Sequence, residues 1–329
     1  MVNKDEATHR RRPFRVVAGV DWSGDSLAGV RRIASLYAPD ELVLVHALQT
    51  AAHESRVQND GGRSRWYMPA NRHQEMSVAS ASRSLKWVSS LIQKNNLSIR
   101  EICTAGAPVN VVAEAAQAVG AALIVVGQRG AGEDLDRTIG SVSHRLCLNA
   151  GCSTLVVRKP WNSPMRVLAL VQEAEDMVAL ERWLRAFPFK EAAELTVLCL
   201  LPPSQRREPI GPLSVRFWKN TAAGNAWFFV NRMVRSLSGP LLRVTGRTSR
   251  ENPSTVLLRE GLNFDLLMLH GSDRKHRYAG RSGLPWRTLL RLAPCSTLIV
   301  RMPDELAGRS APRFSGRVKM QGSVPHPYG

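Results

Sequence analysis

The sequence CSTLVVR at residues 152–158 is almost repeated as CSTLIVR at residues 295–301, 143 positions later. Each copy is an apolar, β-branched run of the kind that forms a buried strand. A repeat on this scale predicts two diverged copies of one domain, and the length of 329 residues agrees with two domains. Other segments match in the same order: 15–26 with 166–177, 40–48 with 193–201, 122–126 with 265–269, and Gly140 with Gly283.

Apolar runs alternate with segments of helical periodicity in both copies. Near-continuous apolar strands separated by helices are typical of parallel sheets that are covered on both faces. The sequence therefore predicts an α/β fold of two tandem Rossmann-like domains, each an open doubly wound five-stranded parallel sheet flanked by helices. The expected strands are 15–21, 41–48, 99–106, 122–127, 153–158, 166–172, 193–201, 241–246, 265–271 and 296–301. The expected helices are 26–38, 77–95, 108–121, 140–151, 225–238 and one near 254–262.

The chain is strongly basic, with a formal net charge of +18 and a pI near 10.7. Residues 161–302 carry +10 of this charge, whereas residues 14–160 carry +4. Such a surface attracts anionic partners, including nucleic acid, acidic proteins and anionic lipid. Because only 6% of residues are aromatic, few side chains can stack on unpaired bases. A solvated basic surface is the simpler interpretation, and specific nucleic-acid binding stays open beside it.

The five cysteines lie far apart and form no CxxC spacing. This pattern predicts buried thiols in a reducing cytosol rather than disulfides or a zinc site. No apolar run approaches the roughly 18 residues that a membrane span requires, and the first dozen residues lack the core of a signal peptide. We therefore expect a cytoplasmic protein without a membrane span.

The glycines after the fourth expected strand follow the pattern Gly127-x2-Gly130-x9-Gly140. In doubly wound sheets, ligands bind at the carboxyl ends of the strands, where Asp21 also lies. Glycine lets a phosphate approach the backbone, and the first amides of the helix expected after Gly140 are free donors for an anion. A triphosphate fits this arrangement. The donors expected for it are the amides of Ser141, Val142 and Ser143, the hydroxyls of Ser141 and Ser143, and the side chain of Arg129 or Arg137.

These motifs resemble the ATP-binding branch of the universal stress protein family. In that branch, Gly-x2-Gly-x9-Gly-Ser/Thr marks the phosphate loop, and an aspartate at the end of the first strand contacts adenine, as Asp21 would here. The family's histidine on the second strand, followed by a residue whose backbone meets the base, is similar to His46-Ala47. CSTLVVR resembles the family's closing strand, which pairs across dimers. The resemblance implies ATP, with Mg²⁺, at Asp21, Ala47, Val126, Gly127, Arg129, Gly130, Gly140, Ser141, Val142 and Ser143.

The resemblance also implies a domain organisation. It covers residues 14–159 well, which are expected to form the nucleotide-binding domain, and residues 164–302 loosely, which are expected to form a degenerate copy of it. We expect a basic disordered arm at 1–13 and a disordered tail at 303–329, because neither segment has hydrophobic periodicity. A long polar loop is expected at 50–75.

The second copy departs from the family pattern at the expected phosphate site. At the positions equivalent to Asp21 and Gly127, the second copy has Gln172 and His270. The proline in Leu284-Pro285, which replaces Ser141-Val142, removes one amide that a phosphate would need. Asp273 replaces Gly130 and would repel a phosphate. We therefore expect nucleotide binding only in the first copy, and a docking or interaction role for the second.

Each candidate residue has a simpler alternative. Asp21 could cap the first helix, and His46 fits a satisfied core histidine. The acidic residues Glu133, Asp134 and Asp136 form either a divalent-ion site or a solvated loop. The resemblance assigns no metal ligand and no catalytic residue among them.

The expected function is that of a cytosolic, ATP-binding stress-response regulator, in which dedicated catalysis is not expected. No lysine follows the glycine loop as it does in a P-loop. The alternatives are a slow ATPase or nucleotidyl-transferring enzyme, and a basic adaptor for nucleic acid or anionic surfaces. The closing strands are expected to pair with each other inside one chain or between the two chains of a homodimer.

Overall fold

The computed structural model describes residues 13–48, 78–92, 97–130, 139–158, 161–201, 223–271 and 286–301. Apart from Pro13, the arm expected at 1–13 lies outside the described residues. The loop at 50–75 and the tail at 303–329 also lie outside them. So do Arg137 and the three acidic residues that precede it in the expected phosphate loop.

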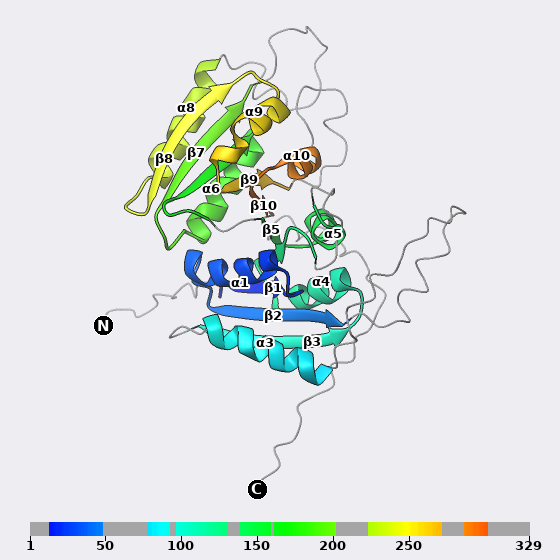
Figure 1. Ribbon diagram of the computed structural model, residues 1–329. Helices are drawn as coiled ribbons and strands as arrows, with labels where there is room; N and C mark the ends of the chain where they lie inside the picture. Colours follow the sequence, from blue (N-terminus) through cyan, green and yellow to red (C-terminus); the bar gives the residue numbers. More distant parts are fainter. Residues whose placement is uncertain are drawn as a thin grey trace, which may run out of the picture.

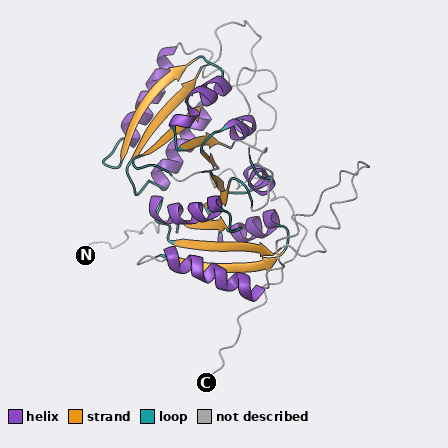
Figure 2. Cartoon of the chain, in the orientation of Figure 1, coloured by secondary structure: helices purple, strands orange, loops and turns teal. Residues whose placement is uncertain are grey.

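The described strands form one ten-stranded sheet in the order β3-β2-β1-β4-β5-β10-β9-β6-β7-β8 (Figures 1 and 2). All neighbours are parallel except β5 and β10, which are antiparallel. Each half is thus a five-stranded parallel sheet, as predicted. The first half holds β1 (Arg15–Gly19), β2 (Glu41–Leu48), β3 (Ser98–Ala105), β4 (Leu123–Gly127) and β5 (Ser153–Val157). The second holds β6 (Met165–Val171), β7 (Ala193–Leu200), β8 (Leu242–Ser249), β9 (Leu266–His270) and β10 (Ser296–Val300).

Helices cover both faces of the sheet and enclose two hydrophobic cores. The helices α1 (Gly24–Leu36), α3 (Val78–Ile92), α6 (Ala174–Ala186) and α8 (Ala223–Leu237) bury one core. The helices α4 (Pro108–Val119), α5 (Ser141–Asn149), α9 (Pro253–Glu260) and α10 (Trp286–Leu292) bury the other. A 3₁₀ turn, η1 (Gly261–Asn263), follows α9. None of the described helices is long and apolar enough to cross a membrane.

Local sequence explains where several of these helices begin and end. Ser23 caps α1 by accepting a hydrogen bond from the backbone of Ser26 at 3.2 Å. Pro108 opens α4, where its missing N–H costs nothing, and Gly120 ends it in the left-handed conformation at φ 62°. The first strand is shorter than expected and ends at Gly19, because the chain turns sharply at Trp22, where φ is 65°.

The repeated sequence forms the join between the halves. The register places Leu155 opposite Leu298, and these two residues are equivalent in the repeat. The antiparallel pair of β5 and β10, which we call the seam, is therefore close to a two-fold axis within one chain. Ser153 Oγ bonds to the backbone of Arg301 at 2.9 and 3.0 Å, and its equivalent, Ser296 Oγ, accepts from the backbone N–H of Arg158 at 3.0 Å. In this structure the closing strands pair with each other inside the chain.

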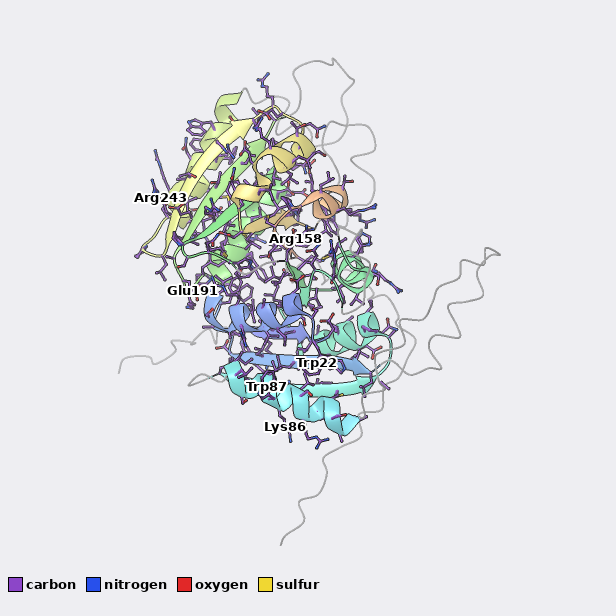
Figure 3. All side chains as sticks on the ribbon, in the orientation of Figure 1. Trp22, Lys86, Trp87, Arg158, Glu191 and Arg243 are labelled. Carbon is purple, nitrogen blue, oxygen red and sulfur yellow. The ribbon has the colours of Figure 1, made fainter. Side chains whose placement is uncertain are left out.

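Aromatic side chains join the halves on the face that carries α1 and α6. Phe14 and Tyr37 come from the first half, and Trp183 comes from α6 of the second half. The Trp183 indole donates a hydrogen bond to the Tyr37 hydroxyl at 3.3 Å. At the rim of this contact, Arg32 pairs with Glu191 at 3.1 Å. Figure 3 labels Glu191 at the junction of the halves. The ten strands thus share a core across the join.

All five cysteines are free thiols. Cys147, Cys199 and Cys295 are buried and Cys152 is half-buried, and desolvation raises the pKa of all four thiols to about 12. Because the thiolate is the reactive form, we expect these four to resist an aromatic disulfide reagent at pH 8 in the folded protein. Unfolding in urea should expose all five to the reagent. Fast reaction of several thiols in the folded state would contradict the buried positions.

Candidate functional site

The residues predicted to hold a nucleotide gather at the carboxyl edge of the first half. The strands β2, β1 and β4 are neighbours and run parallel, so their ends meet at this edge. Asp21 follows β1, Gly127 ends β4, and α5 begins beside them at Ser141. All ten predicted positions lie among the described residues. Ala47, on β2, contributes to the core under α4 and makes no hydrogen bond to the loop among the described residues.

Gly127 allows β4 and α1 to approach each other closely. A Cβ at this position would lie 2.8 Å from the backbone nitrogen of Ser26 and 3.1 Å from the Cβ of Asp25. The Gly127 carbonyl also accepts a hydrogen bond from Ser143 Oγ at 2.5 Å. This glycine therefore has a packing role, and the Ser143 hydroxyl is engaged in holding α5 to β4.

The start of α5 presents backbone donors at this edge. Gly140 is the N-cap residue, its N–H donates to the Gln128 carbonyl at 2.8 Å, and its carbonyl accepts from the N–H of His144 at 2.9 Å. Val142 and Ser143 lie in the first turn, before the first helical hydrogen bond, so their N–H groups have no partner within the helix. The positive end of the helix dipole lies at the same point. Exposure decreases along this turn, because Ser141 is exposed, Val142 is half-buried and Ser143 is buried.

Asp21 supports the cap of α1 rather than forming it. Its Oδ1 accepts hydrogen bonds from the backbone of Ser23 at 3.0 Å and from the Ser23 hydroxyl at 2.6 Å. Its Oδ2 makes no hydrogen bond to any described residue. One oxygen therefore orders the turn, and the other can accept a hydrogen bond from a ligand.

Trp22 and His46 lie beneath this turn. His46 Nδ1 is hydrogen-bonded to the Val20 carbonyl at 2.6 Å, so His46 is a satisfied structural histidine, as expected. The Trp22 and His46 rings lie 5.2 Å apart. The Trp22 Nε1 is buried and has no hydrogen-bond partner among the described residues. Neither the backbone conformation of Trp22 nor its contact with His46 was visible in the sequence.

Charged residues that sequence reasoning missed also lie at this edge. Asp25, in the first turn of α1, is half-buried, and burial raises the pKa of its carboxyl, as does nearby Asp21. Arg129 and Arg158 act in the opposite direction on that pKa. Arg158 ends the repeated motif CSTLVVR, and burial lowers the pKa of its guanidinium. The edge thus combines two carboxylates with two guanidinium groups.

In the second half, a buried side-chain pair lies where the first half has Gly127. His270 Nδ1 lies 3.0 Å from Asp176 Oδ1, and both side chains are buried. Asp176 Oδ2 accepts the backbone N–H groups of Gln172 and Glu173 at 2.9 Å, which completes a capping box at the start of α6. Asp273, Gly283, Leu284 and Pro285 lie outside the described residues.

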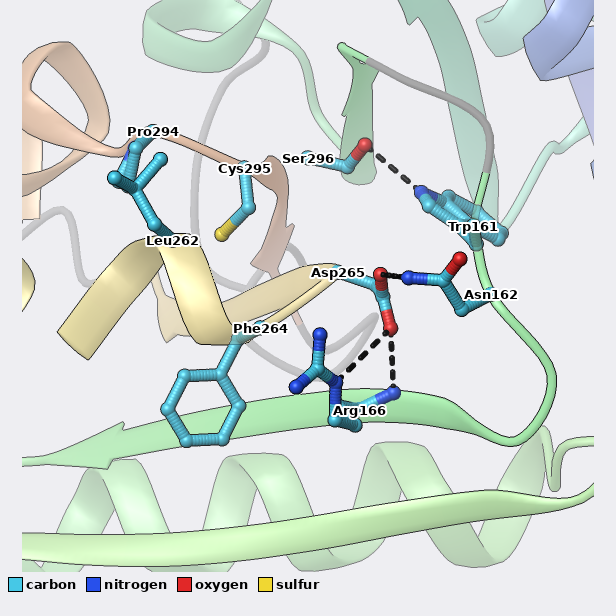
Figure 4. A pocket seen from close by; sticks show the side chains of 9 residues that line it. All are labelled: Trp161, Asn162, Arg166, Leu262, Phe264, Asp265, Pro294, Cys295 and Ser296. Atoms are coloured by element: carbon cyan, nitrogen blue, oxygen red, sulfur yellow. Dashed lines mark hydrogen bonds and ion pairs between the residues drawn. The ribbon is translucent and has the colours of Figure 1, made fainter.

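A pocket of about 170 Å³ lies away from this edge (Figure 4). It is formed near the amino ends of β6, β9 and β10, opposite the predicted nucleotide edge. Its Asp265 carboxylate already accepts hydrogen bonds from Asn162 Nδ2 at 3.0 Å and from the backbone of Arg166 at 2.8 Å. Among the described residues, no cluster of three His, Cys, Asp or Glu side chains could hold a metal ion.

Comparison with known proteins agrees with this architecture. The model of the universal stress protein family matches residues 14–158. A universal stress protein from Archaeoglobus fulgidus DSM 4304 is 13% identical, with a TM-score of 0.56, and the match covers 88% of this chain and 99% of that one. A functionally unknown protein from Pseudomonas aeruginosa PAO1 is 14% identical, with a TM-score of 0.55, over 90% of this chain and 95% of that one. No curated protein matches the sequence.

The fold described above defines a doubly wound α/β protein with two similar halves. Residues 14–158, the first half of the chain, match the model of the universal stress protein family. The structural likeness extends the same fold over both halves.

Proposed function

We propose that this chain is a cytoplasmic, nucleotide-binding regulator of the stress response that holds one ATP, with Mg²⁺, in its first half. The observation that carries the proposal is the start of α5, where three successive amides follow Gly140 at the carboxyl edge of β4. Amides at the positive end of a helix dipole bind phosphate groups in many α/β proteins. A triphosphate laid against the first turn of α5 would meet the amide of Val142 and the positive end of the helix dipole.

The surrounding charges suit an anionic ligand with a polar base. Arg129 and Arg158 bring positive charge to the edge, close enough to affect the pKa of Asp25. The Asp21 Oδ2 would accept a hydrogen bond from the amino group of adenine, in the position that the family resemblance suggests for it. Magnesium would arrive with the nucleotide, because Mg²⁺ prefers phosphate oxygens and water to an all-protein site.

The second half is proposed to serve docking or interaction rather than nucleotide binding. The buried pair of His270 and Asp176 lies at the position where Gly127 packs against α1 in the first half. Asp176 is already engaged by His270 and by the cap of α6, so a phosphate at this position would meet a carboxylate rather than free amides. One nucleotide per chain is therefore expected.

Titration calorimetry with ATP and Mg²⁺ tests the proposal. The wild-type chain should bind about one ATP, and Gly140→Asp should weaken binding by at least about 100-fold, because a carboxylate would repel the phosphates at the helix start. Gly283→Asp, at the equivalent position of the second copy, is the matched control and should leave the affinity unchanged. Absence of binding in the wild type, or equal loss in both variants, would overturn the proposal. Steady ATP turnover that Gly140→Asp abolishes would instead favour the enzymatic alternative.

A further inference from the structure

The helices α5 and α10 belong to different halves, yet they are bridged across the seam (Figure 1). Arg301, which follows β10, donates a hydrogen bond to the Cys147 carbonyl in α5. Its guanidinium also lies 5.5 Å from the centre of the Trp286 ring, at the start of α10. Arg301 is buried, so it links α5 to the start of α10 at a fixed point.

Three exposed arginines lie on these two helices. Arg145 comes from α5, and Arg287 and Arg291 come from α10. None of the three forms an ion pair in the described structure. We call this surface the α5–α10 ridge, defined by Arg145, Arg287 and Arg291. Neither helix contains an acidic residue.

The neighbouring helix α9 shows the contrast. There, Arg259 pairs with Glu251 at 2.6 Å and with Glu260 at 2.7 Å. The charge of α9 is thus balanced locally, whereas the arginines of the ridge form no ion pair with any residue that the structure describes. The arginines of α10 also affect His144, on α5. Burial lowers the pKa of His144, and the positive charges of Arg291 and Arg287 lower it further. An anionic partner would relieve this repulsion.

The chemistry of the ridge favours phosphate over lipid or unpaired bases. The apolar side chains Leu146, Leu289 and Leu290 are buried in the core, so the ridge offers none of these to insert into a bilayer. The guanidinium groups of Arg287 and Arg301 lie 5.6 and 5.5 Å from the centre of the Trp286 ring, so they compete with an unpaired base for stacking on it. The exposed aromatic residues Trp87, Trp227 and Phe228 belong to α3 and α8, the helices of the opposite face.

We propose that the α5–α10 ridge binds the phosphate backbone of a nucleic-acid duplex without reading its sequence. Arginine side chains that contact phosphates dominate such binding and release condensed counterions. The ridge is independent of the proposed nucleotide site, because its arginines lie beyond the first turn of α5 and on α10.

Fluorescence anisotropy with a labelled DNA duplex of random sequence tests the proposal in the full chain. The ridge variant combines Arg145→Gln, Arg287→Gln and Arg291→Gln. At about 50 mM salt we expect it to bind at least about tenfold more weakly than wild type, with the slope of log K against log salt shallower by about 0.9 for each phosphate that is no longer neutralised. The control variant combines Arg83→Gln, Lys86→Gln and Arg182→Gln, which removes the same charge from exposed positions on α3 and α6. The control should bind almost as tightly as wild type.

Several results would overturn the proposal. They are absence of duplex binding by the wild type, equal weakening in both triple variants, and preference for single-stranded DNA or for vesicles of anionic lipid. Gly140→Asp should retain duplex binding, so failure of the nucleotide site and failure of the ridge are separable. The six substituted positions are exposed, and thermal melting confirms that each variant is folded. The three single ridge variants, each expected to reduce the salt slope by about 0.9, provide a second measurement.

Discussion

The variant Leu298→Asp is expected to lower the free energy of unfolding by at least about 4 kcal/mol, because it places a carboxylate without a partner in a dry core. Leu298 is fully buried on β10, and Leu155, opposite it on β5, is 1% exposed. Both residues belong to the core under α1 and α6. The measurement is urea unfolding followed by circular dichroism.

A matched control separates the seam from the chemistry of the substitution. Leu258, on α9, is 66% exposed, so Leu258→Asp should change the free energy of unfolding by no more than about 0.5 kcal/mol. Because the seam is close to a two-fold axis, Leu155→Asp should cost about as much as Leu298→Asp. If either seam variant is as mild as the control, β5 and β10 do not pair as described.

Pairing at the seam also decides which edges of the sheet remain free. Because β5 and β10 each have neighbours on both sides, the strands at the ends of the described sheet are β3 and β8. On β8, Arg243 is exposed and lies beside Glu194 of β7 at 3.7 Å (Figure 3). Charged side chains on an edge strand disfavour pairing with another chain. The closing strands are therefore used for internal pairing, and the remaining edge of the second half is charged.

The repeat and the apolar runs were sufficient to predict the strands and their parallel direction within each half. Two of the described helices were missed. In α6, Met177, Leu180, Trp183 and Leu184 have helical spacing, so the signal was present in the sequence. In α10, only seven residues form the helix, which is too short for a clear periodicity.

The site was only partly predictable, for a physical reason. Because parallel strands end at one edge, the sequence placed Asp21, Gly127 and Gly140 near each other. The approach of Arg158 to Asp25 depends on the packing of β5 beside β4 and α1, which no local pattern encodes. The bond from Ser143 to Gly127 likewise depends on the position of α5.

Replacing Trp183 with alanine should lower the free energy of unfolding by about 3–5 kcal/mol, the usual cost of removing a large buried aromatic side chain. Trp183 is fully buried, and its ring centre lies 4.6 Å from that of Phe187 and 6.4 Å from those of Phe14 and Tyr37. The substitution leaves a cavity where the first and second halves meet. It also removes the indole that donates to the Tyr37 hydroxyl, a group whose pKa is raised by burial.

Trp87→Ala is the matched control, because Trp87 is 59% exposed on α3 (Figure 3). It should change stability by no more than about 0.5 kcal/mol. Tyr37→Phe, alone and combined with Trp183→Ala, completes a double-mutant cycle across the two halves. Because Tyr37 and Trp183 share one hydrogen bond, the two losses should not add, and the coupling should be about 0.5–1.5 kcal/mol. Strict additivity, or two separate unfolding transitions in the wild type, would mean that the halves do not share this core.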